Sequence, residues 1–348
     1  MTLEHFQDRI RAAAAQGEKL RLRGGGTKDF YGNALSGEIL DTRGYAGIVA
    51  YEPSELVVTA RCGTPLAELE NTLAENRQCL PFEPPHFGAA ATLGGSVAAG
   101  LSGPGRAAAG ALRDFVLGIK LIDGRAQALD FGGQVMKNVA GYDVSRLLAG
   151  SLGTLGLIAE VSLKLAPRPQ AEATLRLEMP QGRALETLNR WAGQPLPVSA
   201  TAWQDGELVV RLSGSAAGVR AAAAKIGGES VDEPFWNGIR EHTDPFFSGP
   251  EPLWRLSLPS TAPALPLDGP QLVEWNGGLR WLKSGIDAAL VREAAQRVKG
   301  NATLFRAQDK KANCFAPLAP LLERVHRELK AAFDPAGIFN RGRLLPGL

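Results

Sequence analysis

Cysteine is scarce in this chain, and its scarcity excludes two kinds of metal centre. The 348 residues include three cysteines, Cys62, Cys79 and Cys314, and no two of them form a CxxC pair. Iron–sulfur clusters and structural zinc sites depend on closely spaced cysteine ligands. We therefore expect neither centre in this chain, and we interpret the cysteines as free thiols in a reducing cytosol.

Histidine is almost as rare, with four residues in the whole sequence. His5, His86, His242 and His326 form no HxH or HxxxH pattern, so we expect no metal site. No Ser–His–Asp arrangement stands out either. We interpret His242 as part of a polar loop, and His86 as a loop residue beside a glycine-rich stretch.

Charge bias and long apolar runs are also missing. The formal net charge of +2 predicts no nucleic-acid partner. No run of about 18 apolar residues occurs, so we expect no transmembrane segment. The polar residues 1–11 lack the apolar core of a signal peptide. The expected location is the cytoplasm, with contact to the inner face of a membrane only through partner proteins.

The common nucleotide-binding fingerprints do not fit this sequence. Residues 103–108 resemble a GxGxxG pattern, and Asp123 follows at the expected distance. That pattern needs a strand before it and a helix that opens at its third glycine, whereas here no strand is predicted and Pro104 stands between the glycines. No Walker sequence is present. We therefore reject a Rossmann-type site.

Glycine, by contrast, is abundant and clustered. Residues 91–105 are mostly glycine, alanine and serine, which have small side chains or none. Residues 23–28 (RGGGTK) form a shorter stretch with two cations and a hydroxyl. Backbone N–H groups without a neighbouring Cβ can line an anion-binding concavity. We predict that both stretches are loops that close on one diphosphate. The alternatives are a flexible linker for the longer stretch and a surface turn for the shorter one.

The order of the predicted elements indicates an α+β protein with more than one domain. Residues 1–168 alternate short strands with helices and carry both glycine stretches, up to a break at residues 167–169 (PRP). Residues 169–317 predict a smaller α+β domain with a mostly antiparallel sheet. Residues 318–348 predict a last amphipathic helix and a turn-rich tail.

Seven short motifs follow one another in a specific order. They are RGGGTK (23–28), ATLGGS (91–96), SGPGR (102–106), RDFVLG (113–118), KNVAGYD (137–143), GSLGTLG (150–156) and DPAGIFN (334–340). Each is weak alone, but together they resemble the FAD-binding domain of the vanillyl-alcohol-oxidase and p-cresol-methylhydroxylase (PCMH) family. The resemblance covers residues 1–170 and the tail.

The resemblance implies a two-subdomain PCMH-type FAD module with a smaller cap domain, to which the tail returns. Family members that bind FAD covalently through the first loop carry a histidine there. This chain has Gly26 and Thr27 instead, so we expect non-covalent FAD. The residues that the resemblance assigns to FAD binding are Gly24, Gly25, Gly26, Thr27, Lys28, Thr92, Leu93, Gly94, Gly95, Ser96, Gly103, Arg106, Asp114, Gly153, Thr154, Gly156, Ile158 and Asn340.

Within this family, the sequence is most similar to the FAD-binding subunits of bacterial glycolate oxidases. This implies oxidation of glycolate, a small 2-hydroxy acid, to glyoxylate, with a larger catalytic flavin subunit and an iron–sulfur subunit as partners. The histidine-rich substrate and metal motif of related 2-hydroxy-acid dehydrogenases is absent. The resemblance therefore favours an accessory flavin subunit that passes electrons onward.

Two other functions stay open. A free-standing FAD-dependent oxidase or dehydrogenase would need its own base, for which Tyr142, Lys137, His86 and Glu160 are weak candidates. A structural subunit could have kept the fold and lost the flavin. For partner docking we expect aromatic anchors on the second domain, from the group Phe235, Trp236, Phe246, Phe247 and Trp254.

Overall fold

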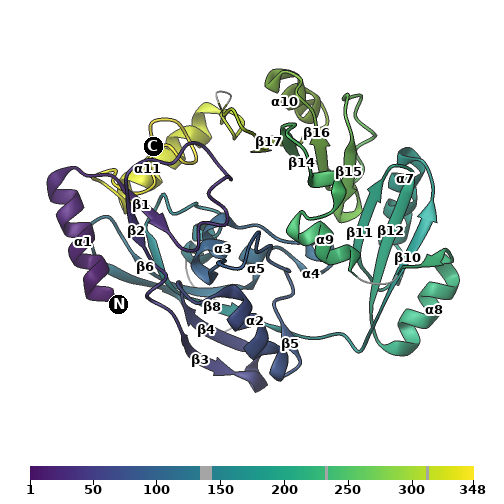
Figure 1. The fold of residues 1–348 in the computed structure, drawn as a ribbon, viewed down its shortest axis with the longest axis horizontal. Coiled ribbons are helices and arrows are strands. Elements are labelled where there is room, and N and C mark those ends of the chain that lie inside the picture. Colours follow the sequence, from purple (N-terminus) through teal and green to yellow (C-terminus); the bar gives the residue numbers. More distant parts are fainter. Residues whose placement is uncertain (134–142, 232–233, 311–312) are drawn as a thin grey trace.

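The computed structural model describes residues 1–133, 143–231, 234–310 and 313–348. Lys137 and Tyr142, two of the base candidates, lie outside the described residues, as does most of the motif at 137–143. Two large β-sheets organise the chain, and Figure 1 shows them as separate units side by side. The expected α+β class, with a largely antiparallel second sheet, is confirmed.

A five-stranded antiparallel sheet forms the core of the first unit. The strand β8 lies at its centre and is largely buried on both faces, since five of its eight residues are apolar and Glu160 and Lys164 are only partly exposed. The helix α2 (Leu66–Glu75) packs into the same core through Leu66, Leu69 and Leu73, which share one helix face. In spatial order the strands are β3 (Ile48–Glu52), β4 (Val57–Arg61), β8 (Leu157–Lys164), β6 (Val116–Ile122) and β7 (Ala128–Gly132).

Smaller elements surround this sheet and carry the glycine stretches. The stretch 91–105, expected as an open loop, instead contains the helix α3 (Leu93–Ala99), which Thr92 caps at its start and Gly100 at its end. The other elements of the first unit are α1 (Leu3–Gln16), β1 (Leu20–Arg23), β2 (Glu38–Asp41), η1 (Pro53–Glu55), β5 (Gln78–Cys79), α4 (Arg106–Ala109), α5 (Leu112–Phe115), α6 (Val144–Leu148) and β9 (Ala166–Pro167).

The second unit is an eight-stranded antiparallel sheet with its three longer helices on one face. The helices α7 (Gln181–Ala192), α8 (Ala216–Ile226) and α10 (Ala288–Arg297) bury their apolar sides against it. In spatial order the strands are β13 (Glu229–Ser230), β10 (Ala171–Glu178), β12 (Glu207–Gly214), β11 (Val198–Gln204), β15 (Gln271–Glu274), β16 (Leu279–Lys283), β14 (Leu253–Ser257) and β17 (Asn301–Arg306). The short helices are α9 (Phe235–Glu241), η2 (Pro245–Phe247) and η3 (Trp275–Gly277).

The other face of this sheet packs against the first unit. A buried apolar cluster joins Tyr31 and Leu152 of the first unit to Trp281 and Phe305 of the second. Polar contacts cross the same boundary: Arg211 pairs with Glu83 at 2.5 Å, the indole of Trp275 donates to the carbonyl of Gly103 at 3.0 Å, and the amide of Phe87 donates to Glu241 at 2.8 Å. The two sheets are therefore held in one fixed arrangement by packing and by ion pairing.

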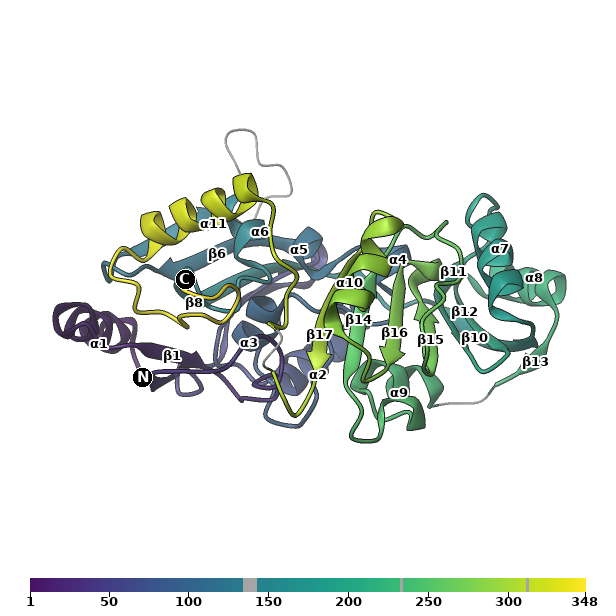
Figure 2. The same ribbon diagram turned by 90° about the horizontal axis from the view of Figure 1, so that it is seen from above.

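The chain finishes on the first unit. The helix α11 (Pro320–Phe333) lies along the first sheet (Figure 2), and the segment after it pairs with β1. Leu20 donates to the carbonyl of Ile338 at 2.7 Å, and Asn340 donates back to Leu20 at 2.9 Å. Inside this junction Lys330 and Asp334 form a buried ion pair of 2.6 Å, in which Lys330 also donates to backbone carbonyls.

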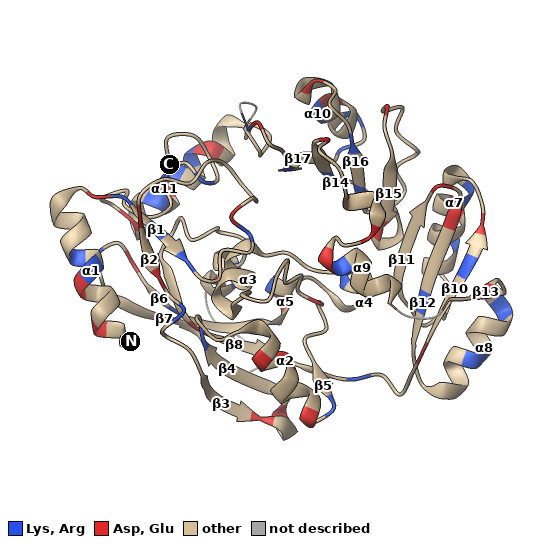
Figure 3. Ribbon diagram, viewed as in Figure 1, with Lys and Arg blue, Asp and Glu red and all other residues tan. Residues whose placement is uncertain are grey.

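Figure 3 shows charges of both signs interspersed over the two units, as on α1 and α11. None of the helices in the described parts of the chain has the length and apolar character needed to cross a bilayer.

Candidate functional site

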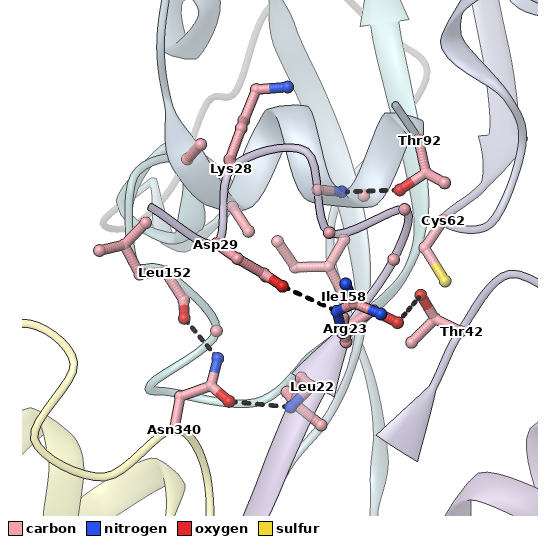
Figure 4. A pocket seen from close by; sticks show the side chains of 18 of the residues that line it. Leu22, Arg23, Lys28, Asp29, Thr42, Cys62, Thr92, Leu152, Ile158 and Asn340 are labelled. Atoms are coloured by element: carbon pink, nitrogen blue, oxygen red, sulfur yellow. Dashed lines mark hydrogen bonds and ion pairs between the residues drawn. The ribbon is translucent and has the colours of Figure 1, made fainter. Parts of the chain in front are cut away.

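A pocket in the first unit gathers the glycine stretches (Figure 4). Its walls come from the loop after β1, from α3, from the segment leading into β8, and from the tail residue Asn340. The residues expected to bind FAD that line this pocket are Gly24, Gly25, Gly26, Thr27, Lys28, Thr92, Gly94, Gly95, Gly153, Gly156, Ile158 and Asn340.

The loop after β1 supplies free hydrogen-bond donors. The backbone amides of residues 24–28 have no acceptor within the described parts of the chain, whereas the next amide, of Asp29, donates to Gly26 at 3.0 Å. Gly26 adopts a left-handed conformation with φ of 73°, which turns the loop at small energetic cost because glycine has no Cβ. Consecutive unpaired amides in a tight loop are suited to binding an anion.

The glycines of this loop also let it approach the segment before α3. A Cβ on Gly24 would lie 2.2 Å from the hydroxyl oxygen of Thr92, and one on Gly25 would lie 1.5 Å from the carbonyl oxygen of Ala90. Both distances are far below van der Waals contact. Glycine is therefore required here for packing between the two glycine stretches, as well as for access by a ligand.

The second stretch contributes differently from what the sequence suggests. The first amides of α3 are already bonded within the protein: Leu93 donates to Thr64 at 2.9 Å, Gly94 donates to Cys62 at 2.8 Å, and Gly95 donates to the Thr92 side chain at 3.3 Å. The side of Gly95 is open, since a Cβ there would meet only Thr92, at 3.2 Å. This stretch therefore offers a backbone surface from which no side chain projects at Gly95. The free hydrogen-bond donors come from the first loop.

The pocket lining contains three cations, Lys28, Arg23 and Arg343. Burial lowers the pKa of the Lys28 ammonium group to about 8, against a smaller opposing effect of Glu241. The ammonium donates to the carbonyl of His86 at 3.2 Å and has no ion-pair partner among the residues described. Arg23, by contrast, is paired with Asp29 at 2.9 Å, and the guanidinium of Arg343 donates to the backbone carbonyl of Asp29 at 2.9 Å. Lys28 is therefore the side chain with charge available for an anionic ligand.

Asn340 connects three parts of the pocket wall. Its amide nitrogen donates to the carbonyl of Leu152 at 2.6 Å, and its amide oxygen accepts from the backbone of Leu22 at 2.8 Å (Figure 4). Each end of the side chain is thus bonded to backbone. The residue lines the pocket as expected, and its observed contacts fix the loops that form the wall.

Some residues expected to bind FAD lie outside the lining and stay predictions: Leu93, Ser96, Gly103, Arg106, Asp114 and Thr154. Leu93 is in the core, and the Ser96 hydroxyl is buried without a partner among the described residues. Gly103 and Arg106 both contact Trp275, with the guanidinium 4.5 Å from the ring centroid.

The last two of these residues have local bonds. Asp114, within α5, accepts from the backbone of Ala111 at 2.9 Å, just before the start of that helix. Thr154 donates to the carbonyl of Ser151 at 2.8 Å, on the side of the loop that faces α11.

The two base candidates that the structure describes lie away from the pocket lining. The imidazole of His86 is 3.0 Å from Glu70. Glu160 accepts from the Tyr45 hydroxyl at 2.7 Å and pairs with Lys120 at 3.1 Å. Both side chains are therefore already bonded to groups of the protein.

A second, smaller cavity lies between the units, and it contains polar residues that the sequence analysis missed. His242 is not in a polar loop, which corrects the earlier interpretation: its ring stacks on Phe247 at 3.8 Å between centroids, and burial lowers its pKa well below the usual value. Glu274 is buried, and burial raises its pKa to about 7. Arg255 lines the same cavity. The sequence signal that could have identified Arg255 and Glu274 is a charged residue at an inward position of a mainly apolar strand.

The aromatic residues expected to anchor partners mostly serve this chain's own core. Trp236, Phe246, Phe247 and Trp254 are all buried within the chain, so the expectation of a docking surface is wrong for these four. Phe235 is partly buried and packs against Trp236.

Comparison with known proteins agrees with this geometry. Residues 2–132 match the family model described as an FAD binding domain. The chain is 47% identical over 337 residues to the glycolate oxidase subunit GlcE of Escherichia coli (strain K12), which covers 97% of this chain and 95% of that protein. A shorter match, 38% over 84 residues, links 24% of this chain to 18% of the glycolate oxidase subunit GlcD of Bacillus subtilis (strain 168).

The fold itself has solved relatives. An alkyldihydroxyacetonephosphate synthase structure superposes with a TM-score of 0.68 at 14% identity, over 97% of this chain and 75% of that one. This likeness identifies the fold, a PCMH-type FAD-binding architecture, and agrees with the expectation drawn from the seven motifs.

Proposed function

We propose, since the chain belongs to the GlcE family of glycolate oxidase subunits, that it is the FAD-carrying subunit of a glycolate oxidase complex. The observation that carries this proposal is the 47% identity along nearly the full length of both chains. A match of that extent includes the pocket, the second unit and the tail together.

The pocket fits the diphosphate of FAD. The amides of residues 24–28 and the ammonium of Lys28 would hold the phosphates, and the bare surface of α3 near Gly95 would allow close approach. FAD, when bound, supplies an acceptor for the two electrons that leave an alcohol carbon. Gly26 and Thr27, in place of a histidine, support non-covalent binding.

The partners follow from what the reaction requires. Oxidation of glycolate to glyoxylate releases two electrons, which must leave the flavin for the next turnover. The three cysteines of this chain are scattered in the sequence, so we place the iron–sulfur acceptor on a partner subunit, beside a larger flavin subunit related to GlcD.

The experiment compares the chain alone with the complex. We expect purified chain to be yellow and to release FAD on acid precipitation, while turning over glycolate or D-lactate only slowly with a dye as acceptor. Addition of the flavin and iron–sulfur partners should restore turnover. Full activity of the isolated chain would instead favour a free-standing oxidase. A folded, colourless chain that takes up no FAD would favour a structural subunit.

A further inference from the structure

The loop that supplies the free amides, residues 24–28, is held at both ends by residues outside it. At its first end, Thr42 donates to the carbonyl of Arg23, at 2.9 Å from its backbone amide and at 3.3 Å from its hydroxyl (Figure 4). At its other end, the bonds come from Arg343 in the tail. The geometry of the loop therefore depends on the tail as well as on the neighbouring strands.

The guanidinium of Arg343 donates to three backbone carbonyls at this end of the loop. They are the carbonyls of Asn33, of Lys28 at 3.3 Å and of Asp29 at 2.9 Å. A planar guanidinium carries several N–H donors in fixed directions, so one side chain can fix several carbonyls at once. In return, Asn33 donates from its backbone amide to the carbonyl of Arg343 at 3.0 Å and from its side chain to that of Gly342 at 3.1 Å. Arg343 and the end of the loop therefore hold each other in place.

Arg343 is buried, and no carboxylate lies within ion-pair distance of it in the described parts of the chain. Burial lowers its pKa to about 10, and the negative charge of Asp29 opposes that change. The Asp29 carboxylate is itself in contact with two other guanidiniums, those of Arg21 and Arg23. Carbonyl oxygens replace only part of the hydration of a guanidinium, so a charge buried in this way lowers the stability of the fold.

Other carboxylates near the loop are already paired with cations of their own. Glu241, which acts on Lys28, pairs with Arg240 at 2.9 Å. Asp41 pairs with Arg43 at 2.6 Å. Positive charge is therefore in excess around the loop, and a bound anion would offset it.

We propose that Arg343 is a positioning residue for FAD, which fixes the loop so that its free amides meet the diphosphate and which adds a buried positive charge beside that group. This inference rests on the proposed function, since it concerns the cofactor of that same site. Arg343 lines the pocket together with Lys28. Lys28 would contact the phosphates directly, whereas the N–H groups of Arg343 that bond the loop carbonyls would act through the loop. With a pKa of about 10, Arg343 stays charged at neutral pH.

The test is a titration of the full chain, freed of flavin, with FAD and with ADP, which contains the same diphosphate. We expect Arg343→Met to weaken the binding of both ligands by roughly 10- to 100-fold. Arg343→Lys keeps the charge and loses the fork of donors, so it should recover part of the affinity. The phosphorus NMR resonances of bound ADP should shift in Arg343→Met, a change that a role in stability alone would not produce.

The matched control is Arg341→Met, at an exposed arginine of the same tail that does not line the pocket. It should keep the wild-type affinities and the wild-type phosphorus spectrum. A lower melting temperature in Arg343→Met with unchanged affinity and spectrum would identify Arg343 as structural and overturn the proposal. If Arg343→Met does not fold, Arg343→Lys decides by the same two measurements, and wild-type values for both would overturn the proposal.

The two ligands separate this inference from the proposed function. A chain that binds ADP and takes up no FAD would contradict the proposed function, and the ADP titration of the variants would still decide the role of Arg343. A wild-type chain that binds neither ligand would overturn both.

Discussion

At the scale of single residues, the site contains a lysine, Lys28, whose pKa is lowered by burial. Lys28 would meet the diphosphate as a cation, yet its pKa of about 8 means that the free protein loses this charge just above neutral pH. Its neighbours in the loop contribute backbone donors, which do not titrate. The affinity for FAD should therefore depend on pH through this one side chain.

We predict that FAD affinity falls as the pH rises from about 7 to about 9, because Lys28 becomes neutral in the unliganded pocket. Lys28→Met should weaken binding at about pH 7 by roughly 10- to 100-fold and should remove most of the pH dependence. Fluorescence titration of FAD against the chain freed of flavin measures both effects. Lys225→Met, at a surface lysine of α8, should keep the wild-type profile. A flat wild-type profile would contradict the prediction.

Glu274 links pH to folding in the opposite sense from an ordinary surface carboxylate. Burial raises its pKa to about 7, with repulsion from Glu83 in the same direction and the Trp281 hydrogen bond and Arg255 opposing it. The folded chain therefore retains a proton that the unfolded chain loses near pH 4.5. The contribution of Glu274 to the free energy of unfolding is therefore fully present below the pKa of the unfolded chain. It is lost as the pH rises through about 7.

The expected loss is about 3 kcal/mol between about pH 4 and about pH 8. Urea unfolding of the wild type and of Glu274→Gln should show it, because glutamine keeps the shape and removes the ionisation. The difference between the two unfolding free energies should favour the variant increasingly as the pH rises. Parallel pH profiles would show that Glu274 does not ionise in this range.

Residue patterns in the sequence located the pocket but not the cavity. Clustered glycines are visible in any sequence, and they line the pocket. The sequence does not show which backbone amides are free. The carbonyls of Thr64 and Cys62, which accept from the first amides of α3, lie some thirty residues earlier in the chain. Arg255 and Glu274 were missed because a charged residue in a strand is ordinarily exposed, and only the packing of one unit on the other covers them.

At the scale of elements, α3 shows how tertiary contacts override propensity. Two adjacent glycines in a helix of 7 residues are unfavourable locally, which is why the stretch predicted a loop. Leu93 and Val97, four residues apart, bury one side of the helix in the core, and the caps at Thr92 and Gly100 satisfy its ends. The helix therefore forms despite its composition.

At Gly95, helix stability and FAD binding favour different residues. We predict that Gly95→Ala raises the free energy of unfolding by up to about 1 kcal/mol, because alanine favours a helix. The same methyl group would occupy the open side of α3 in the pocket and weaken FAD binding by roughly 1 to 3 kcal/mol. Thermal unfolding and flavin content measure the two effects.

The control is Gly182→Ala in α7, where a Cβ would meet nothing within 4 Å. It should leave flavin content unchanged. Normal FAD retention in Gly95→Ala would show that the cofactor does not approach α3. Substitution of Gly25 is a poorer probe, since any Cβ there would collide with Ala90 and disrupt the loop itself.

At the scale of the whole molecule, the C-terminal segment completes the first unit, because it pairs with β1 after α11. Lys330→Met would leave Asp334, whose side chain is fully buried, without its cation, and we expect a loss of about 3 to 5 kcal/mol in stability. The tail and Asn340 should loosen, so flavin should be lost at a lower urea concentration than in the wild type. Arg327→Met removes an exposed pair on the same helix and should change stability by less than about 1 kcal/mol. Equal effects of the two variants would contradict this role for Lys330.

The pairing of residues 338–340 with β1 has a consequence for biosynthesis. Strand β1 and its glycine loop leave the ribosome early, but the residues that fix their position are translated more than 300 positions later, as the bond between Leu22 and Asn340 shows. A nascent chain therefore cannot finish this pocket before residues 338–340 have been made. Flavin incorporation should follow the synthesis of these residues, and a product terminated before residue 338 should fail to retain the cofactor.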